Sequence, residues 1–340
     1  MKGAVFEGKH MIVIKEDLTK PTIEEDEVLI KTKKVAICGS DVGSYEVGGP
    51  YFPGNVLGHE FSGEVVDVGA KVKKIKVGSR VTVNPQLPCN KCYYCLHDQE
   101  NMCKIKNYAL GTTENGAMRE FLNVKAERVH LLPDNVSFEH AAMVEPISVA
   151  LYAVIESDFQ IGQTATVIGA GPIGLFVIQV LKAAGADKIF VLEPVEFKQK
   201  KALELGANNV YKPTAWKKIT RQVDNNIGTD HVYDCVGLST TFITSLNVIK
   251  KGGKITLIGM HASSFEINNI LYMTTNNITV RGVYGYNQEI FRIAINLLEQ
   301  QKILVDPLIT KKIKLEDVPA IFEKLSKPEH DELKVIVELD

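Results

Sequence analysis

The feature that most constrains the fold is a glycine-rich turn between two apolar segments. The strand-like run ATVIG leads directly into Gly169-Ala-Gly171-Pro172-Ile173-Gly174, and the apolar run LFVIQVLKAAGA follows. A GxGxxG pattern is informative when a strand precedes it and a helix follows it. The first glycine permits a tight turn, the second lets the backbone approach a pyrophosphate, and the third lets helix and strand pack closely. The sequence therefore predicts a dinucleotide site at the N-terminus of a helix.

The next apolar strand ends in an acidic residue. The segment KIFVLEP places Glu193 19 residues after Gly174, close to the roughly 20 residues expected for an acid that binds the adenosine ribose. A carboxylate there would repel a 2′-phosphate, so NAD is predicted and not NADP. Lys198 lies just beyond and could flank the adenosine. The alternative is that the glycines only form a turn and that Glu193 is a solvated strand end.

The pattern of predicted secondary structure changes near residue 150. Before it, short β-like runs broken by Gly and Pro predict a small, irregular β-barrel or sandwich. From about residue 160, strand-like and helix-like segments alternate, which is typical of a parallel sheet covered by helices. An amphipathic segment and a final β-like run, ELKVIVEL, could return to the first domain. The prediction is an α/β protein divided into residues 1–150, 151–286 and 287–340.

Composition and charge exclude some classes of partner. The 39 basic and 41 acidic residues give a net charge of −2, which offers no electrostatic reason to expect a nucleic acid or an acidic membrane as partner. The most apolar run, residues 165–181, contains Gly, Pro and Gln and fits a strand, turn and helix better than a membrane span. The N-terminus has no signal-peptide pattern. We therefore expect a cytoplasmic protein whose clustered cysteines stay reduced.

Four of the six cysteines lie within residues 88–104. Cys89, Cys92, Cys95 and Cys103 have the spacing C-x2-C-x2-C-x7-C. Four thiolates so close together can surround one tetrahedral zinc ion and leave no position for a substrate, which predicts a structural site. An iron–sulfur cluster is the rival reading, although the ferredoxin run has three residues before its last cysteine and a proline after it. Disulfides would require an oxidising compartment.

A second possible metal site is dispersed along the chain. Cys38 lies in ICGSD, His59 and Glu60 lie in GHEFSG, and Glu145 lies in MVEPIS. A thiolate, an imidazole and carboxylates could bind zinc and still leave an exchangeable position, as catalytic zinc requires. Each residue also has an ordinary structural explanation, such as a buried cysteine or a helix-start acid. Spacing alone leaves both explanations open.

The order of the motifs along the chain is typical of one family. GHEFSGEVVDVG, VGSRV, the four-cysteine segment, VEP and GAGPIG follow one another, and in this the chain resembles the zinc-dependent medium-chain alcohol and polyol dehydrogenases over essentially its whole length. The resemblance implies a GroES-like catalytic domain with a structural zinc lobe at 88–104, a Rossmann NAD domain, and a C-terminal return to the catalytic domain. It also implies two zinc ions per chain, NAD, a small-molecule substrate and a homodimer or homotetramer.

The resemblance assigns roles to individual residues. Cys38 and His59 would bind the catalytic zinc. Glu60 and Glu145 would complete the shell, directly or through a zinc-bound water. Ser40, in CGSD, matches the hydroxyl that passes the substrate proton in this family.

One position departs from the family pattern. Many relatives carry a histidine that passes this proton on to solvent, and here Gly43 occupies its place. The usual end of the proton relay is therefore missing. Glu60, a water chain or a cofactor ribose hydroxyl could replace it.

Within the family the chain is similar to the galactitol-1-phosphate, sorbitol and butanediol dehydrogenase branch. The predicted function is hydride transfer from a secondary hydroxyl of a polyol or polyol phosphate, such as galactitol 1-phosphate, to NAD. The alternatives are a 2,3-butanediol, sorbitol or other secondary alcohol dehydrogenase and, from another class, a non-catalytic NAD-binding protein. Tyr286, in VYGYN, lies where sugar-alcohol relatives contact substrate, and a core aromatic is the alternative reading.

Overall fold

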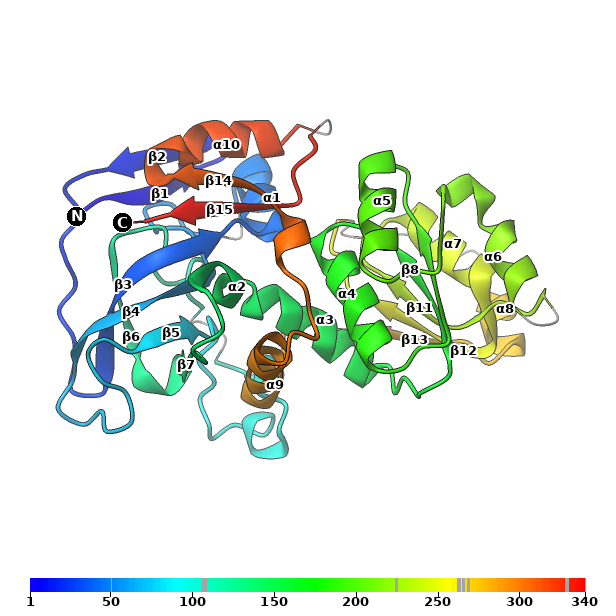
Figure 1. Ribbon diagram of the computed structural model, residues 1–340, viewed down its shortest axis with the longest axis horizontal. Helices are drawn as coiled ribbons and strands as arrows, with labels where there is room; N and C mark the ends of the chain where they lie inside the picture. Colours follow the sequence, from blue (N-terminus) through cyan, green and yellow to red (C-terminus); the bar gives the residue numbers. More distant parts are fainter. Residues whose placement is uncertain are drawn as a thin grey trace. The chain divides into compact units, whose positions relative to one another are not determined.

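The chain forms two compact units, described here from a computed structural model (Figure 1). The first consists of Met1–Glu145, Asn287–Gln300 and Val305–Asp340, and the second of Pro146–Tyr286 and Gln301–Leu304. The structure describes residues 1–49, 51–105, 109–223, 226–261, 264, 267, 270–327 and 330–339.

The first unit is built on a seven-stranded sheet in the order β14-β15-β3-β4-β5-β7, with β6 paired to β3. Only β14 and β15 are parallel, and the other pairs are antiparallel. A separate hairpin joins β1 (Gly3–Gly8) to β2 (Met11–Lys15). The strands of the sheet are β3 (Glu27–Ala36), β4 (Glu60–Val68), β5 (Arg80–Val83), β6 (Phe121–Lys125), β7 (Val129–Leu131), β14 (Ile309–Lys314) and β15 (Lys334–Glu338).

Strand β3 pairs with β4 along one edge and with both β6 and β15 along the other. Its first half pairs with β6, and its last three residues, 34–36, pair with β15. The C-terminal strand thus extends the sheet where β6 ends. The helices of this unit are α1 (Gly39–Val47), α2 (Phe138–Ala142), α9 (Gln288–Glu299) and α10 (Val318–Leu325).

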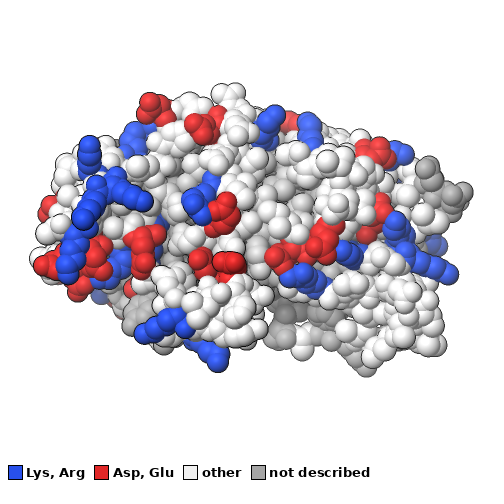
Figure 2. Space-filling view, turned by 90° about the horizontal axis from the view of Figure 1, so that it is seen from below, with Lys and Arg blue, Asp and Glu red and all other residues white. Residues whose placement is uncertain are grey.

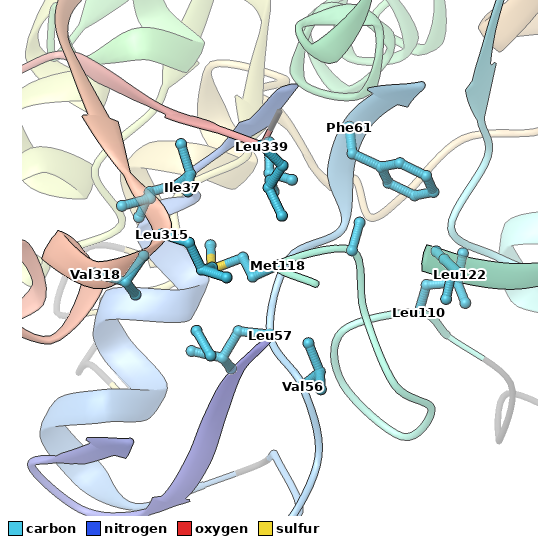
Figure 3. Close-up of a cluster of buried hydrophobic side chains, with 14 of the residues drawn as sticks. Ile37, Val56, Leu57, Phe61, Leu110, Met118, Leu122, Leu315, Val318 and Leu339 are labelled. Carbon is cyan, nitrogen blue, oxygen red and sulfur yellow. The ribbon is translucent and has the colours of Figure 1, made fainter. Parts of the chain in front are cut away.

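Side chains from distant parts of the sequence fill the core of the first unit. Figure 3 shows Ile37, Leu57, Met118, Leu315 and Val318 pointing into one cluster, and all of them are buried. Ile37 directly precedes Cys38, and Leu57 lies two residues before His59. Apolar packing therefore fixes the two backbone segments that carry these candidate metal ligands. Truncating such a core side chain to alanine costs about 2–5 kcal/mol.

The second unit is a six-stranded parallel sheet in the order β10-β9-β8-β11-β12-β13. Numbered within the unit this order is 3-2-1-4-5-6, the doubly wound arrangement that binds dinucleotides where the strand order reverses. Helices α4, α5 and α7 pack on the sheet (Figure 1). The elements are β8 (Thr164–Ile168), α4 (Pro172–Ala183), β9 (Lys188–Leu192), α5 (Glu196–Glu204), β10 (Asn209–Tyr211), α6 (Lys217–Gln222), β11 (Thr229–Asp234), α7 (Ser239–Val248), β12 (Ile249–Leu257), α8 (Ile270–Thr275) and β13 (Thr279–Gly282).

The division into units differs from the expected bounds in two places. The first unit ends at Glu145 and not at residue 150, and residues 301–304 belong to the second unit. Helix α3 (Val144–Glu156) runs through the first of these positions. A continuous helix leaves no turn or loop signal, so the sequence could not mark the break there.

The surface carries charges of both signs. Figure 2 shows basic and acidic side chains interspersed on the face that it draws, in keeping with the small net charge. Within the described part of the chain, no helix is both long and apolar enough to cross a membrane.

Candidate active site and metal centres

The dispersed metal candidates meet at one end of the seven-stranded sheet. Strand β3 ends at Ala36, and β4 begins at Glu60, which lies opposite Ala36 in the antiparallel register. Cys38 follows β3 and His59 precedes β4, so this pairing brings the two side chains together. The ligand atoms of Cys38, His59 and Glu60 all lie within 4.8 Å of one another.

The surroundings of His59 fit a metal-bound imidazole. Its Nδ1 lies 3.4 Å from Asp41 Oδ1, and the other oxygen of Asp41 accepts a hydrogen bond from the Cys38 amide at 3.0 Å. Burial alone would lower the pKa of His59, but the charges of Asp41 and Cys38 raise it well above its usual value. The pocket therefore favours positive charge at this position. A carboxylate beside the imidazole is a common outer-shell partner of a zinc-binding histidine.

A lysine that the sequence analysis missed is part of this site. Lys334 Nζ donates hydrogen bonds to both oxygens of Glu60, at 2.6 and 2.5 Å, and to the Ile37 carbonyl at 3.3 Å. Burial would lower the pKa of Lys334, yet Glu60, Cys38 and Glu145 raise it. The signal that could have identified it is a lysine directly before the apolar run VIV.

Glu145 lies close to this cluster but outside its tight group. The residue is half-buried at the start of α3, and its charge helps to raise the pKa of Lys334. In the described part of the chain, the group with mutual ligand distances below 4.8 Å contains Cys38, His59 and Glu60 only. The structure thus brings three of the four predicted ligands into one group. The direct or water-mediated role of Glu145 stays a prediction.

Ser40 belongs to a chain of hydrogen-bonded groups beside the ligands. Its Oγ lies 3.1 Å from the hydroxyl of Tyr51, which donates to Asp41 Oδ1 at 3.0 Å. Tyr51 is another residue that the sequence analysis missed, because an aromatic residue in the segment YFPG carries no signal of its own. A Cβ at Gly43 would have no atom within 4 Å, so crowding next to the backbone does not require glycine at this position.

The four clustered cysteines have the geometry of a closed tetrahedral site. The Sγ–Sγ distances are 3.9 Å for Cys89–Cys95, 3.5 Å for Cys92–Cys95 and 4.0 Å for Cys92–Cys103. A tetrahedron with Zn–S bonds of about 2.3 Å has edges of about 3.8 Å. All four are free thiols. Backbone N–H groups at Cys95 and Lys104 lower the pKa of Cys92 to about 6, which favours the thiolate that a metal needs. The residues fit a structural zinc ion.

The cysteine lobe is attached to the C-terminal segment of the same unit. Two short 3₁₀ turns, η1 (Cys95–His97) and η2 (Glu100–Met102), shape the lobe. The Gln288 amide donates to the Glu100 carboxylate at 2.8 Å, and the Asn287 side chain donates to the Asp98 carbonyl at 3.3 Å. The lobe thus caps the N-terminus of α9.

The glycine-rich turn of the second unit performs the expected steric roles. Gly169 has a φ of 90°, a conformation that favours glycine. A Cβ on Gly174 would lie 1.9 Å from the Gly169 carbonyl oxygen, whereas a Cβ on Gly171 would have no atom within 4 Å. Pro172 and Ile173 begin helix α4, directly after Gly171. The turn is therefore tight on its inner side and open at Gly171.

Glu193 is tied to this turn and is not a solvated strand end. It is 4% exposed, and its two carboxylate oxygens accept hydrogen bonds from the amides of Ala170 at 2.7 Å and Val195 at 2.9 Å. Lys198 is half-buried on α5. Tyr286 is buried, at 1% exposure, which favours the packing role over substrate contact, and its substrate role stays a prediction.

Comparison with known proteins identifies the class. A model described as "Alcohol dehydrogenase GroES-like domain" matches residues 24–134, and one described as "Zinc-binding dehydrogenase" matches residues 172–300. D-arabitol-phosphate dehydrogenase of Enterococcus avium is 36% identical over 95% of this chain and 92% of its own. Sorbitol dehydrogenase of Bacillus subtilis is 31% identical over 99% and 97%. The crystal structure of galactitol-1-phosphate dehydrogenase from Escherichia coli is 25% identical, covers 100% of both chains and has a TM-score of 0.91.

The chain belongs to the family of zinc-dependent medium-chain alcohol and polyol dehydrogenases. The predicted fold, a GroES-like domain with a Rossmann parallel sheet, is confirmed. So is the enzyme class, an oxidoreductase that acts on alcohols or polyols. The predicted cofactors, zinc and NAD, are those of this family, and the two clusters of candidate ligands provide sites for two zinc ions.

Proposed function

We propose that this enzyme oxidises a secondary hydroxyl of a polyol phosphate, such as galactitol 1-phosphate, with NAD as hydride acceptor. The observation that carries the proposal is the convergence of Cys38, His59 and Glu60 beside the Ser40 hydroxyl. Relatives named for D-arabitol phosphate and galactitol 1-phosphate match the chain over nearly its whole length, which favours a phosphorylated substrate. An unphosphorylated polyol is the second candidate, because a sorbitol dehydrogenase matches it too.

The residues at the end of the sheet would hold the catalytic zinc. Cys38, His59 and Glu60 supply a thiolate, an imidazole and a carboxylate, and Glu145 completes the set directly or through water. When bound there, zinc serves as a Lewis acid that lowers the pKa of a substrate hydroxyl. Asp41 orients His59, and Ser40 accepts the proton of the substrate hydroxyl. Lys334 balances part of the negative charge that these ligands bring into a buried place.

The glycine-rich turn and Glu193 would bind the dinucleotide. The open backbone at Gly171 and the N-terminus of α4 suit a pyrophosphate. Glu193 keeps lone pairs free after its two backbone hydrogen bonds, so its carboxylate can still accept from ribose hydroxyls. The same negative charge disfavours a 2′-phosphate. Lys198 would flank the adenosine. By analogy with the family, we expect a homodimer or homotetramer.

A substrate panel tests the proposal. NAD reduction is followed with galactitol 1-phosphate, D-arabitol phosphate, sorbitol and 2,3-butanediol, each at equal concentration. We expect the highest kcat/KM with a polyol phosphate. Activity with sorbitol alone would favour the second candidate, and activity with butanediol alone would contradict both.

Metal analysis separates an enzyme from a non-catalytic dinucleotide-binding protein. The native chain should carry two zinc ions and the C38A variant only one. C235A is the matched control, because Cys235 lies in the other unit and outside both candidate metal groups. A native chain with one zinc that survives C38A would show that the dispersed residues do not bind metal.

A further inference from the structure

Tyr51 is a buried tyrosine at the candidate active site to which no role has yet been assigned. Its side chain belongs to the apolar core of the first unit and packs edge-on against Phe6, with ring centroids 6.3 Å apart. Only 5% of the residue is exposed. Its hydroxyl is the one polar atom of this side chain, and it contacts both Ser40 and Asp41.

The carboxylate of Asp41 sets the direction of these hydrogen bonds. Asp41 is 1% exposed, and an ionised carboxylate can only accept. Its Oδ2 accepts from the Cys38 amide and its Oδ1 accepts from Tyr51. A phenol has a single hydrogen, which Tyr51 uses toward Asp41. Tyr51 can therefore only accept from Ser40, so the hydrogen of the Ser40 hydroxyl points toward Tyr51.

The orientation of Ser40 has a chemical consequence. When its hydrogen points to the buried tyrosine, its lone pairs point away from Tyr51, and Ser40 as a residue is exposed. A hydroxyl held in this way is ready to accept a hydrogen bond from a substrate hydroxyl. Burial, together with Asp41 and Cys38, raises the pKa of Tyr51 well above its usual value, so the phenol keeps its hydrogen at neutral pH.

We propose that Tyr51 is a positioning residue that holds the Ser40 hydroxyl as the hydrogen-bond acceptor for the substrate hydroxyl. The inference rests on the proposed function, in which Ser40 takes the substrate proton. It also supplies a partner for Ser40 in a chain that has Gly43 where many relatives have a histidine. Tyr51 acts through Ser40 and does not itself contact the reacting atoms.

The test compares Y51F with a matched control in the zinc-loaded, full-length enzyme. Y51F removes one oxygen and keeps the ring. Y45F removes the same atom from another buried tyrosine, whose hydroxyl has no hydrogen bond within the described residues and whose ring packs against His10 and Phe322. With the best substrate of the panel, Y51F should lower kcat about 10- to 100-fold. Its KM for NAD and its zinc content should stay at the native values, and its Tm should fall because the buried Asp41 carboxylate loses a hydrogen bond. Y45F should match the native enzyme throughout.

A double-mutant cycle tests whether Tyr51 acts through Ser40. In the S40A background, adding Y51F should lower kcat by less than about threefold, because the hydroxyl that it orients is already gone. The full Y51F effect on top of S40A would overturn the inference, as would native kcat in Y51F or loss of zinc from it. If the native enzyme oxidises no compound of the panel, the proposed function fails, and this inference with it. An active native enzyme with an unaffected Y51F overturns the inference alone.

Discussion

Lys334 and Glu60 form a buried ion pair, with Nζ at 2.6 and 2.5 Å from the two carboxylate oxygens. Lys334 is 2% exposed and Glu60 is fully buried. The lysine begins β15, the last strand of the chain, and the Ile37 amide donates to the Val335 carbonyl in the β15–β3 pairing. Because this register places Lys334 beside Cys38, the C-terminal strand brings a positive charge to the group of candidate metal ligands.

Removing this lysine should destabilise the zinc-free protein strongly. K334M leaves the buried Glu60 without its cation, which costs about 3–5 kcal/mol of unfolding free energy. With zinc present the loss should be smaller, because the metal then supplies positive charge to the same carboxylate. Urea unfolding with zinc and with a chelator measures both values. K312M, which removes a half-exposed partner of Glu139, should cost less than about 1 kcal/mol in either condition. Equal losses for K334M and K312M would contradict the role assigned to the pair.

Replacing Glu193 should change the choice of dinucleotide. E193A removes the proposed ribose acceptor and also the hydrogen bonds to the amides of Ala170 and Val195. Affinity for NAD should fall by roughly tenfold or more, since a lost hydrogen bond to a charged group is worth about 1.5–3 kcal/mol. Affinity for NADP should fall much less, because the repulsion of its 2′-phosphate disappears as well. Binding titrations with both dinucleotides measure this, and equal losses would restrict Glu193 to anchoring the turn.

The cysteine lobe should lose one metal ion without loss of the other. C92S removes one of four thiolates, so the zinc content should fall from two ions to one per chain. C235S is the control and should retain both. Because the lobe is bonded to the start of α9 through Gln288 and Asn287, limited proteolysis should then cut within residues 88–104. A C92S protein with two zinc ions would mean that this cluster holds no zinc.

Local features of the sequence were sufficient for part of this structure. The glycines at 169, 171 and 174 shape one turn and the start of the helix that follows it. Because these contacts are local, the spacing of the glycines was enough to predict the turn. The four cysteines span only 15 residues, and their spacing likewise reflects their geometry. Glu193 could be placed from its distance to Gly174, although its hydrogen bonds to the turn could not.

The candidate catalytic cluster depends on contacts between distant segments. Cys38 and His59 meet because Ala36 pairs with Glu60, a register that the sequence pattern does not encode. The family resemblance predicted these ligands, whereas the spacing of the residues alone left the prediction open. Lys334 and Tyr51 matched no motif, because the role of each comes from a strand pairing or a loop that carries it into the site. Buried partners of this kind become visible only when the tertiary structure is known.

His231 should make the stability of the second unit depend on pH. It is 2% exposed on β11, its Nε2 lies 2.9 Å from Gln163 Oε1, and burial, aided by Lys254, lowers its pKa to about 4. An unfolded histidine titrates near 6.5, so between these values the unfolded chain binds the extra proton. Stability is therefore complete above about pH 6.5 and falls as the pH drops toward 4.

This pH dependence can be assigned to one residue by substitution. The native protein should lose about 2–3 kcal/mol from His231 between pH 7 and pH 4.5, measured by urea unfolding. H231F should not show the loss of unfolding free energy that is assigned to His231. H10F, which replaces an exposed histidine, should show the same loss as the native protein. Any zinc released at low pH affects all three proteins alike, so the difference between them isolates the histidine. Identical pH profiles for the native protein and H231F would show that His231 is already protonated in the folded state or is not buried.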